Sequence, residues 1–331
     1  MKKRFAASAM ILAMSAATVL SPLTAFAEAE EQELNIAIFQ GGYGDAYWNQ
    51  MVELFEKSHE GVKVNMTISP TIGDIIRPQI VAGNVPDFIC LNDGGEDGVI
   101  LSLIKEHALL NLNDVFDGEN YAGTGTLRDD ITDGILASSK CAPYGDGDIY
   151  LAPFNSGPQG LIYNKTFFDE NNLEVPKTWD EFIDVLQKIK DAGEQPLLMT
   201  YKDAWTALAP WNSIAADLAP ESFADDRKAG KTTFVGTHEE IAEKYLTLLD
   251  YAQDDYMGLS YDDGNKKFAN GDAVMIINGN WAISQYRNAN PDVKINMFAL
   301  PSSNDESQNK VTSGVDVLLG VSKSSSNVDA A

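Results

Sequence analysis

Short apolar runs alternate with amphipathic segments along the first third of the chain, and this alternation constrains the fold more than any other feature. Residues 34–39, 62–68 and 87–91 have the length and apolar content of buried strands. Residues 46–58 and 72–81 lie between them and favour helices. Strands joined through helices pair in parallel with right-handed crossovers. The sequence therefore predicts an open α/β fold, in which ligands bind at the carboxyl ends of the strands.

A polar break interrupts the chain near its middle. Residues 149–154 and 161–165 are apolar runs typical of strands, whereas residues 155–160 consist of turn-forming residues too polar for a core. Thr178 and Glu181 have the spacing of a capping box, so a helix is expected to begin there. We interpret the polar break as a hinge between two strands.

The second half repeats the pattern of strands and helices. Apolar runs predict strands at residues 196–199, 273–277, 295–300 and 314–321. Thr237 and Glu240 have the spacing of a second capping box, and residues 223–233 are charged and predicted to form a loop. A chain of 331 residues exceeds the usual size of one domain. We expect one lobe of residues 33–153 and 316–331, and a second of residues 156–314.

The first 27 residues have the organisation of a signal peptide. Lys2, Lys3 and Arg4 precede an apolar run, and small residues end at Ala27, the expected cleavage site. The apolar run is shorter than the roughly 20 residues that span a bilayer. No cysteine stands near the cleavage site, so a lipid anchor is not expected. The sequence predicts an extracytoplasmic protein, periplasmic or secreted.

The composition excludes several classes of partner. The formal net charge is −25, and −28 once the three basic residues of the leader are removed. Phosphate contacts need clustered Lys and Arg, so nucleic acid and anionic membranes are not expected partners. His59, His107 and His238 are scattered without metal-ligand spacing, and neither a metal nor a cofactor is expected. Cys90 and Cys141 do not make a disulfide framework, and their redox state stays open.

Three motifs occur in a fixed order in the second half: residues 161–165, residues 176–182, and residues 268–281, which end in Asn278-Gly279-Asn280-Trp281. Together they resemble the extracellular solute-binding proteins of carbohydrate ABC importers, the maltose-binding-protein-like family. The resemblance implies a type II two-lobe fold with mostly parallel sheets flanked by helices. It also implies that the lobes close on a sugar or oligosaccharide and deliver it, without catalysis, to the membrane subunits of an ABC permease.

The resemblance also bears on the ligand and on the length of the chain. Residues 41–44, 76–78 and 83–87 are similar to the branch that takes N-acetylglucosamine and diacetylchitobiose. Members of the family usually continue past residues 322–326 into several more helices, so C-terminal helices are expected to be missing here. A monomer is expected. Two alternatives stay open: a secreted carbohydrate-active enzyme, which needs two carboxylates across the scissile bond, and a polyamine-binding protein of the same fold.

Trp281 is the leading candidate for ligand contact. It follows the apolar run 273–277, and in the resembling proteins the aromatic residue at this place stacks on the sugar. Asn278 stands between the two and is a second candidate. Tyr201 and Trp205 follow another predicted strand, where the family commonly has an aromatic residue.

The remaining candidates come from the first half and the crossing. Gln40 and Tyr43 lie in a glycine-rich loop after the first strand, where backbone can approach a ligand closely. Asn92 and Asp93 directly follow the third strand and serve either as ligand contacts or as ordinary turn residues. Asn155 lies in the polar break. Trp48 and Trp179 are interpreted as core because of their spacing along helices. Trp211 competes with Tyr201 and Trp205 for the position that faces the ligand, and a core position is favoured for it.

Overall fold

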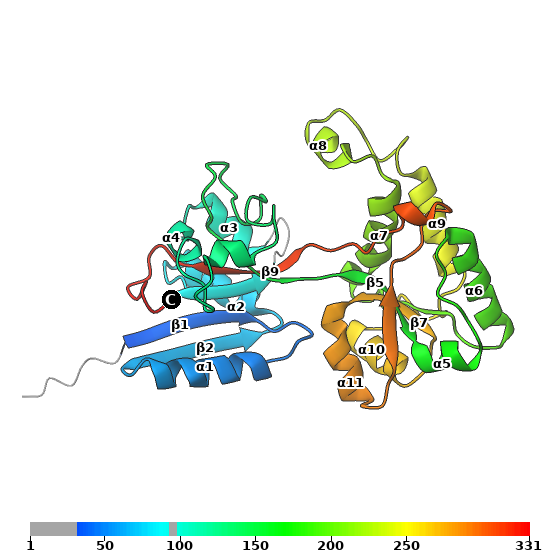
Figure 1. The fold of residues 1–331 in the computed structure, drawn as a ribbon, viewed down its shortest axis with the longest axis horizontal. Helices are drawn as coiled ribbons and strands as arrows, with labels where there is room; N and C mark the ends of the chain where they lie inside the picture. The colour runs from blue at the N-terminus through cyan, green and yellow to red at the C-terminus, as the bar shows by residue number, and fades with distance from the viewer. Residues whose placement is uncertain (1–31, 93–97) are drawn as a thin grey trace, which may run out of the picture.

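The chain folds into two lobes, each built on its own sheet and joined by two crossing segments (Figure 1). The computed structural model describes residues 32–92 and 98–331. The predicted leader therefore lies outside the described residues. The two-lobe α/β architecture predicted from the sequence is confirmed.

The first sheet combines parallel and antiparallel pairs. Its strand order is β2 (Val62–Ser69), β1 (Gln32–Phe39), β3 (Phe88–Asn92), β9 (Val315–Val321) and β4 (Ala152–Ser156). β1 pairs in parallel with β2 and β3, as the alternation of strands and helices predicts. β9 then pairs antiparallel with both β3 and β4. The carboxyl ends of β1 and β3 consequently lie at the same edge of the sheet.

Helices cover both faces of this sheet (Figure 1). They are α1 (Ala46–Ser58), α2 (Ile72–Val81), α3 (Val99–Lys105) and α4 (Asn113–Phe116), followed by a 3-10 helix at Leu127–Asp130. Ile72, Ile76 and Leu103 are fully buried against one face. Trp48, Val52 and Phe55 of α1 repeat at i, i+4 and i+7 and pack on the other face.

The second sheet has the order β6 (Leu197–Leu198), β7 (Met275–Gly279), β5 (Gln159–Asn164) and β8 (Ile295–Phe298). Around it lie α5 (Lys165–Glu170), α6 (Trp179–Asp191), α7 (Leu208–Leu218), α8 (Phe223–Lys228), α9 (Glu239–Leu249), α10 (Tyr261–Ala269) and α11 (Ile283–Ala289), with 3-10 helices at Ala204–Ala207, Asn280–Ala282 and Glu306–Gln308. Across the described residues, three strand pairings are parallel and four are antiparallel. The sheets are therefore mixed, whereas mostly parallel sheets were expected, because β9 and β5 each run against their neighbours.

Three of the predicted local signals differ from the structure. At α6 the Thr178 hydroxyl accepts from the Glu181 amide at 3.3 Å, but the Glu181 carboxylate accepts from Lys177, one residue before the predicted partner. The capping box at Thr237 is wrong: α9 begins at Glu239, and the Thr237 hydroxyl instead donates to the carbonyl of Thr233. The predicted loop at residues 223–233 contains α8.

The two crossing segments are hydrogen-bonded to each other. β4 continues through a short connector into β5, and the connector runs beside the residues that precede β9 (Figure 1). The Gly157 amide donates to the carbonyl of Gly314 at 2.9 Å, and the Gln159 amide donates to that of Thr312 at 2.9 Å. The predicted hinge is thus a two-stranded ribbon. Cys90 and Cys141 are buried and not joined to each other.

Candidate functional site

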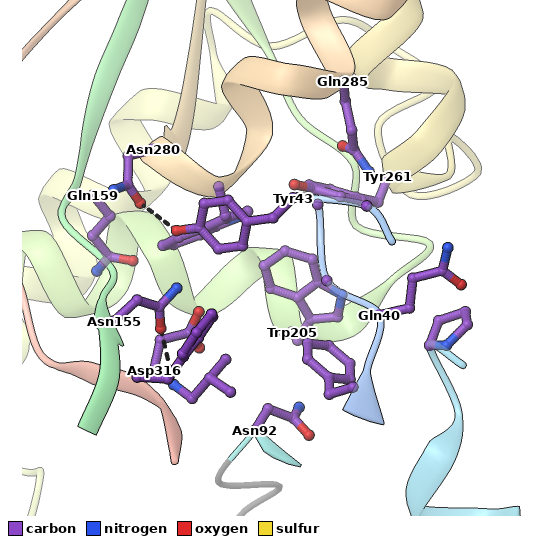
Figure 2. A pocket seen from close by; sticks show the side chains of 18 of the residues that line it. Gln40, Tyr43, Asn92, Asn155, Gln159, Trp205, Tyr261, Asn280, Gln285 and Asp316 are labelled. Atoms are coloured by element: carbon purple, nitrogen blue, oxygen red, sulfur yellow. Dashed lines mark hydrogen bonds between the residues drawn. The ribbon is translucent and has the colours of Figure 1, made fainter. Parts of the chain in front are cut away.

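A cavity of about 1350 Å³ lies between the lobes, beside the crossing segments (Figure 2). It exceeds the roughly 300–1,000 Å³ that is usual for small-molecule sites, so it has room for an extended ligand. Aromatic rings from both lobes line it: Phe39, Tyr43, Tyr47, Trp48 and Phe154 from the first lobe and its crossing, and Trp205, Tyr261 and Trp281 from the second.

Three of the aromatic rings on the first-lobe wall, those of Tyr47, Trp48 and Phe154, form a cluster. The Trp48 and Phe154 ring centroids are 5.3 Å apart in a stacked arrangement, and Tyr47 lies 5.3 Å from Trp48 and 5.8 Å from Phe154. Tyr47 and Trp48 stand in the first turn of α1, immediately after the loop that follows β1. Trp48 both packs on the core, as its spacing predicts, and lines the cavity.

The second-lobe wall contains a pair formed by Trp205 and Tyr261, whose ring centroids are 4.8 Å apart. The Trp205 side chain is 48% exposed, so a large part of its surface is free to contact a ligand. The backbone amide of Tyr261 donates to the Asp203 carboxylate at 2.6 Å, which ties the start of α10 to the 3-10 helix that carries Trp205. Burial raises the pKa of the Tyr261 hydroxyl, so this group is neutral near pH 7.

Trp281 lies in the 3-10 turn between β7 and α11 and lines the cavity. The adjacent Asn280 amide donates to the carbonyl of Pro158 at 3.0 Å, which fixes this turn to the crossing segment. The Trp281 side chain is half-buried and packs on the second-lobe core with its inner side. One part of the indole is therefore held by the protein while another faces the cavity.

The two lobes touch at one side of the cavity. The Tyr43 hydroxyl donates to the Asn280 side-chain oxygen at 3.1 Å (Figure 2), and the Ser284 hydroxyl donates to the Gly42 carbonyl. Burial raises the pKa of the Tyr43 hydroxyl, and the negative charge of Asp316 raises it further, so the hydroxyl keeps its proton near neutral pH. The loop after β1 thus contacts the turn that carries Trp281.

Amides and carboxylates complete the lining. Gln40, Asn92 and Asn155 face the cavity from the ends of β1, β3 and β4 (Figure 2). Three carboxylates also line it, those of Asp203, Asp262 and Asp316, and among the residues that the structure describes no Lys, Arg or His does so. Burial raises the pKa of the Asp316 carboxyl, and the nearby positive charge of Lys140 opposes that shift.

Comparison with known proteins identifies the family. The model of the family described as bacterial extracellular solute-binding protein matches residues 41–331. This chain belongs to that family. Within the described ranges, no cluster of His, Cys, Asp or Glu in this solute-binding protein is arranged to hold a metal ion. None of the helices in those ranges is long and apolar enough to cross a membrane.

Two curated relatives are similar over large parts of the solute-binding protein. The "Multiple sugar-binding protein" of Streptococcus mutans is 26% identical over 305 residues, which cover 89% of this chain and 68% of that protein. The "Diacetylchitobiose binding protein NgcE" of Streptomyces coelicolor is 31% identical over 170 residues, which cover 51% of this chain and 34% of that protein.

Solved structures share the fold. "SBP RafE in complex with raffinose" superposes with a TM-score of 0.72 at 22% identity, covering 90% of this solute-binding protein and 75% of that chain. "Chitin oligosaccharide binding protein" superposes with a TM-score of 0.70 at 20% identity, covering 88% of this solute-binding protein and 74% of that chain. At these identities the likeness establishes the two-lobe fold.

Asn278, one of the predicted contact residues, does not line the cavity. Its side chain is 3% exposed and donates to the Tyr286 hydroxyl at 2.8 Å and the Asn265 oxygen at 3.2 Å, while its own oxygen accepts from the Gly279 amide at 2.9 Å. Asn265 in turn donates to Gln285, which lines the cavity. Because strand side chains alternate between faces, Asn278 points into the helix-covered core. The structure therefore places it behind the site.

Tyr201 is also placed away from the cavity. Its ring packs among second-lobe residues, 5.5 Å from Tyr256 and 6.3 Å from Tyr245, and burial raises its pKa. The turn after β6 directs Tyr201 inward and brings Trp205 to the cavity instead. Trp179 and Trp211 pack against the second-lobe core and do not line the cavity, as expected. Asp93, the remaining candidate, lies outside the described residues.

Several lining residues were not predicted from the sequence: Phe154, Gln159, Tyr261, Asn280, Gln285 and Asp316. For two of them, Asp316 and Tyr261, the sequence contained a feature that could have indicated a place in the site. Asp316 is a single carboxylate inside an otherwise apolar strand, which is a costly position without a role. Tyr261 is the first residue of α10 and directly follows the capping residue Ser260, whose side chain accepts from the Asp263 amide.

Proposed function

We propose that this protein is the substrate-binding component of an ABC importer and captures an uncharged sugar or oligosaccharide between its lobes. The observation that carries the proposal is a large interlobe cavity lined by aromatic rings from both lobes. A pyranose has apolar C–H faces and a rim of hydroxyls, so its site needs flat apolar surfaces together with planar polar groups. Gln40, Asn92 and Asn155 supply the polar groups.

The charge of the lining supports a neutral ligand. The charged side chains that line the cavity in the described part of the chain are carboxylates. A phosphorylated or acidic sugar would meet repulsion there, because none of the described Lys, Arg or His side chains lines the cavity. The names of the relatives, multiple sugar-binding and diacetylchitobiose binding, support an oligosaccharide, and N-acetylglucosamine or diacetylchitobiose is the first choice among candidates.

Closure of the lobes supplies the remaining affinity. Micromolar binding corresponds to about 8 kcal/mol. Two aromatic stacks contribute on the order of 1 kcal/mol each beyond area burial, so they are insufficient alone. A sugar that contacts both walls favours the closed form over the open one, and it gains hydrogen bonds in a cavity without bulk water. The closed form is what a membrane permease can distinguish.

The proposal extends to the setting of the protein. We propose a monomer without catalytic activity, exported by a leader cleaved after Ala27. We also propose that the lobes comprise residues 33–153 with 316–331, and residues 156–314.

Calorimetric titration against a panel of neutral mono- and oligosaccharides tests the function. We expect at least one of maltose, raffinose and diacetylchitobiose series to bind, and glucose 6-phosphate and glucuronate not to bind. If spermidine binds and no sugar does, the polyamine alternative is supported. The carboxylates of Asp203, Asp262 and Asp316 in the cavity are the feature that would bind a polyamine. Turnover of an oligosaccharide to shorter products at enzyme-like rates would contradict the assignment as a binding protein.

A further inference from the structure

Three glycines from three separate segments surround Trp281. Gly42 belongs to the loop between β1 and α1 in the first lobe. Gly157 belongs to the connector between β4 and β5, and Gly279 ends β7 in the second lobe. Trp281 is thus the place where the first lobe, the hinge and the second lobe meet.

At Gly279 and Gly157 the indole occupies the space that a side chain would need. A Cβ at Gly279 would overlap with three ring carbons of Trp281, and one at Gly157 would lie 3.0 and 3.3 Å from two of them. Gly279 has φ −118° and ψ 174°, an extended conformation open to any residue, and Gly157 does not have positive φ. At Gly279 the requirement for glycine therefore comes from the indole and not from the backbone conformation. At Gly157 a Cβ would make a tight contact with the indole and would also lie 3.4 Å from the Asp316 Cβ, so the indole is the main obstacle there.

At Gly42 the obstacle is different. A Cβ there would overlap with the backbone carbonyl oxygen of Trp281, an atom that cannot rotate away as a side chain can. This close approach accompanies the hydrogen bonds from Ser284 to Gly42 and from Tyr43 to Asn280. Gly42 therefore lets the first-lobe loop reach the turn that carries Trp281.

We propose that Gly42, Gly157 and Gly279 are positioning residues for Trp281. Gly157 and Gly279 set the plane of the indole against the hinge and β7, and Gly42 lets the first lobe reach the same turn. A ligand that stacks on the cavity side of the indole is then in indirect contact with the hinge, because the other side of the indole packs against Gly157. The contribution to ligand binding rests on the proposed function, whereas the packing of the glycines against Trp281 does not.

Urea unfolding without ligand tests the packing. We expect Gly279→Ala and Gly157→Ala to lower the unfolding midpoint in the wild type and to leave it unchanged in a Trp281→Ala background, because removal of the indole frees the space. Gly42→Ala should lower the midpoint in both backgrounds, because its obstacle is backbone. Gly314→Ala is the matched control, since Gly314 is also in the crossing, lacks positive φ and has nothing within 4 Å of a built Cβ.

Additive effects of Gly279→Ala and Trp281→Ala, or a rescue of Gly42→Ala by Trp281→Ala, would overturn the assignment. Titration with the sugar that binds the wild type then tests the functional part. We expect Gly42→Ala and Gly157→Ala to weaken binding about tenfold, the loss of roughly one aromatic contact, and Gly314→Ala to bind normally. Wild-type affinity in both variants would remove their role in binding. If no sugar binds the wild type, the proposed function fails while the unfolding result still decides the packing.

Discussion

Replacement of Asn278 by leucine separates a structural role from a role in ligand contact. The wild-type side chain makes three hydrogen bonds inside the second lobe, to Tyr286, Asn265 and the Gly279 amide. Leucine has a similar size but neither donors nor acceptors. The variant therefore leaves buried polar groups without their partners.

The expected magnitude follows from these three contacts. An unsatisfied buried polar group costs about 1–3 kcal/mol, and Tyr286 and Asn278 are both almost completely buried. We expect Asn278→Leu to lower the free energy of unfolding by about 3 kcal/mol, the low end of about 1 kcal/mol for each of the three groups that lose their partner, the Tyr286 hydroxyl, the Asn265 oxygen and the Gly279 amide. With a urea m-value of about 2–3 kcal/mol/M, the midpoint should fall by roughly 1 M or more.

Urea unfolding followed by circular dichroism measures this change. Asn296→Leu is the matched control, because Asn296 belongs to β8 of the same lobe, is exposed and does not line the cavity. The control should unfold within about 0.5 kcal/mol of the wild type, as exposed substitutions usually do. If Asn278→Leu unfolds like the wild type but no longer binds the ligand, Asn278 is a contact residue and our placement of it behind the site is refuted.

Three further predictions concern the site, its charge and one helix cap. Trp281→Ala should weaken sugar binding about tenfold or more in calorimetry with the fold intact, while Tyr121→Ala, at an exposed tyrosine that does not line the cavity, should bind normally; equal affinities would exclude Trp281 from the site. Asp316→Asn should stabilise the protein at pH 7 and lose this effect below about pH 3.9, the pKa of an unfolded Asp. Because the pKa of Asp316 is raised in the folded state, the wild type loses stability as the pH rises from the unfolded pKa to the folded pKa, and Asn avoids this loss. Lower stability of the variant at pH 7 would contradict this. Thr178→Ala should cost about 1 kcal/mol in urea unfolding, and more than Thr237→Ala, whose hydroxyl does not cap its helix; equal losses would count against the capping assignment.

Periodic segments with a clear start were predicted to the residue. The bounds of α1 and α2 agree with those predicted from the sequence, and α6 begins where the capping threonine, Thr178, predicts. Strand pairing was harder, because direction and register depend on partners far away in the chain. β9 lies between β3 and β4 and reverses the direction that the first three strands establish, and nothing local in its sequence indicates this.

The site was predictable where position along a strand was sufficient. Gln40, Asn92 and Asn155 line the cavity because they stand at the ends of strands in one sheet. The orientation of side chains was harder to predict. Asn278 lies within β7 and Trp281 follows it three residues later, yet the Asn278 side chain points into the core and the Trp281 side chain lines the cavity. Tyr261 and Asp316 come from segments more than fifty residues apart, and only the folded chain brings them to the same cavity.

The pairing of the two crossing segments limits how the lobes can move. Since Gly157 is bonded to Gly314 and Gln159 to Thr312, the segments must bend as one strip. A strip flexes easily across its flat face and resists shear along its length. A rotation of the two lobes about the paired crossing segments is therefore easier than a sliding motion between them. A one-residue insertion in either segment would shift the pairing and change the orientation of one lobe relative to the other.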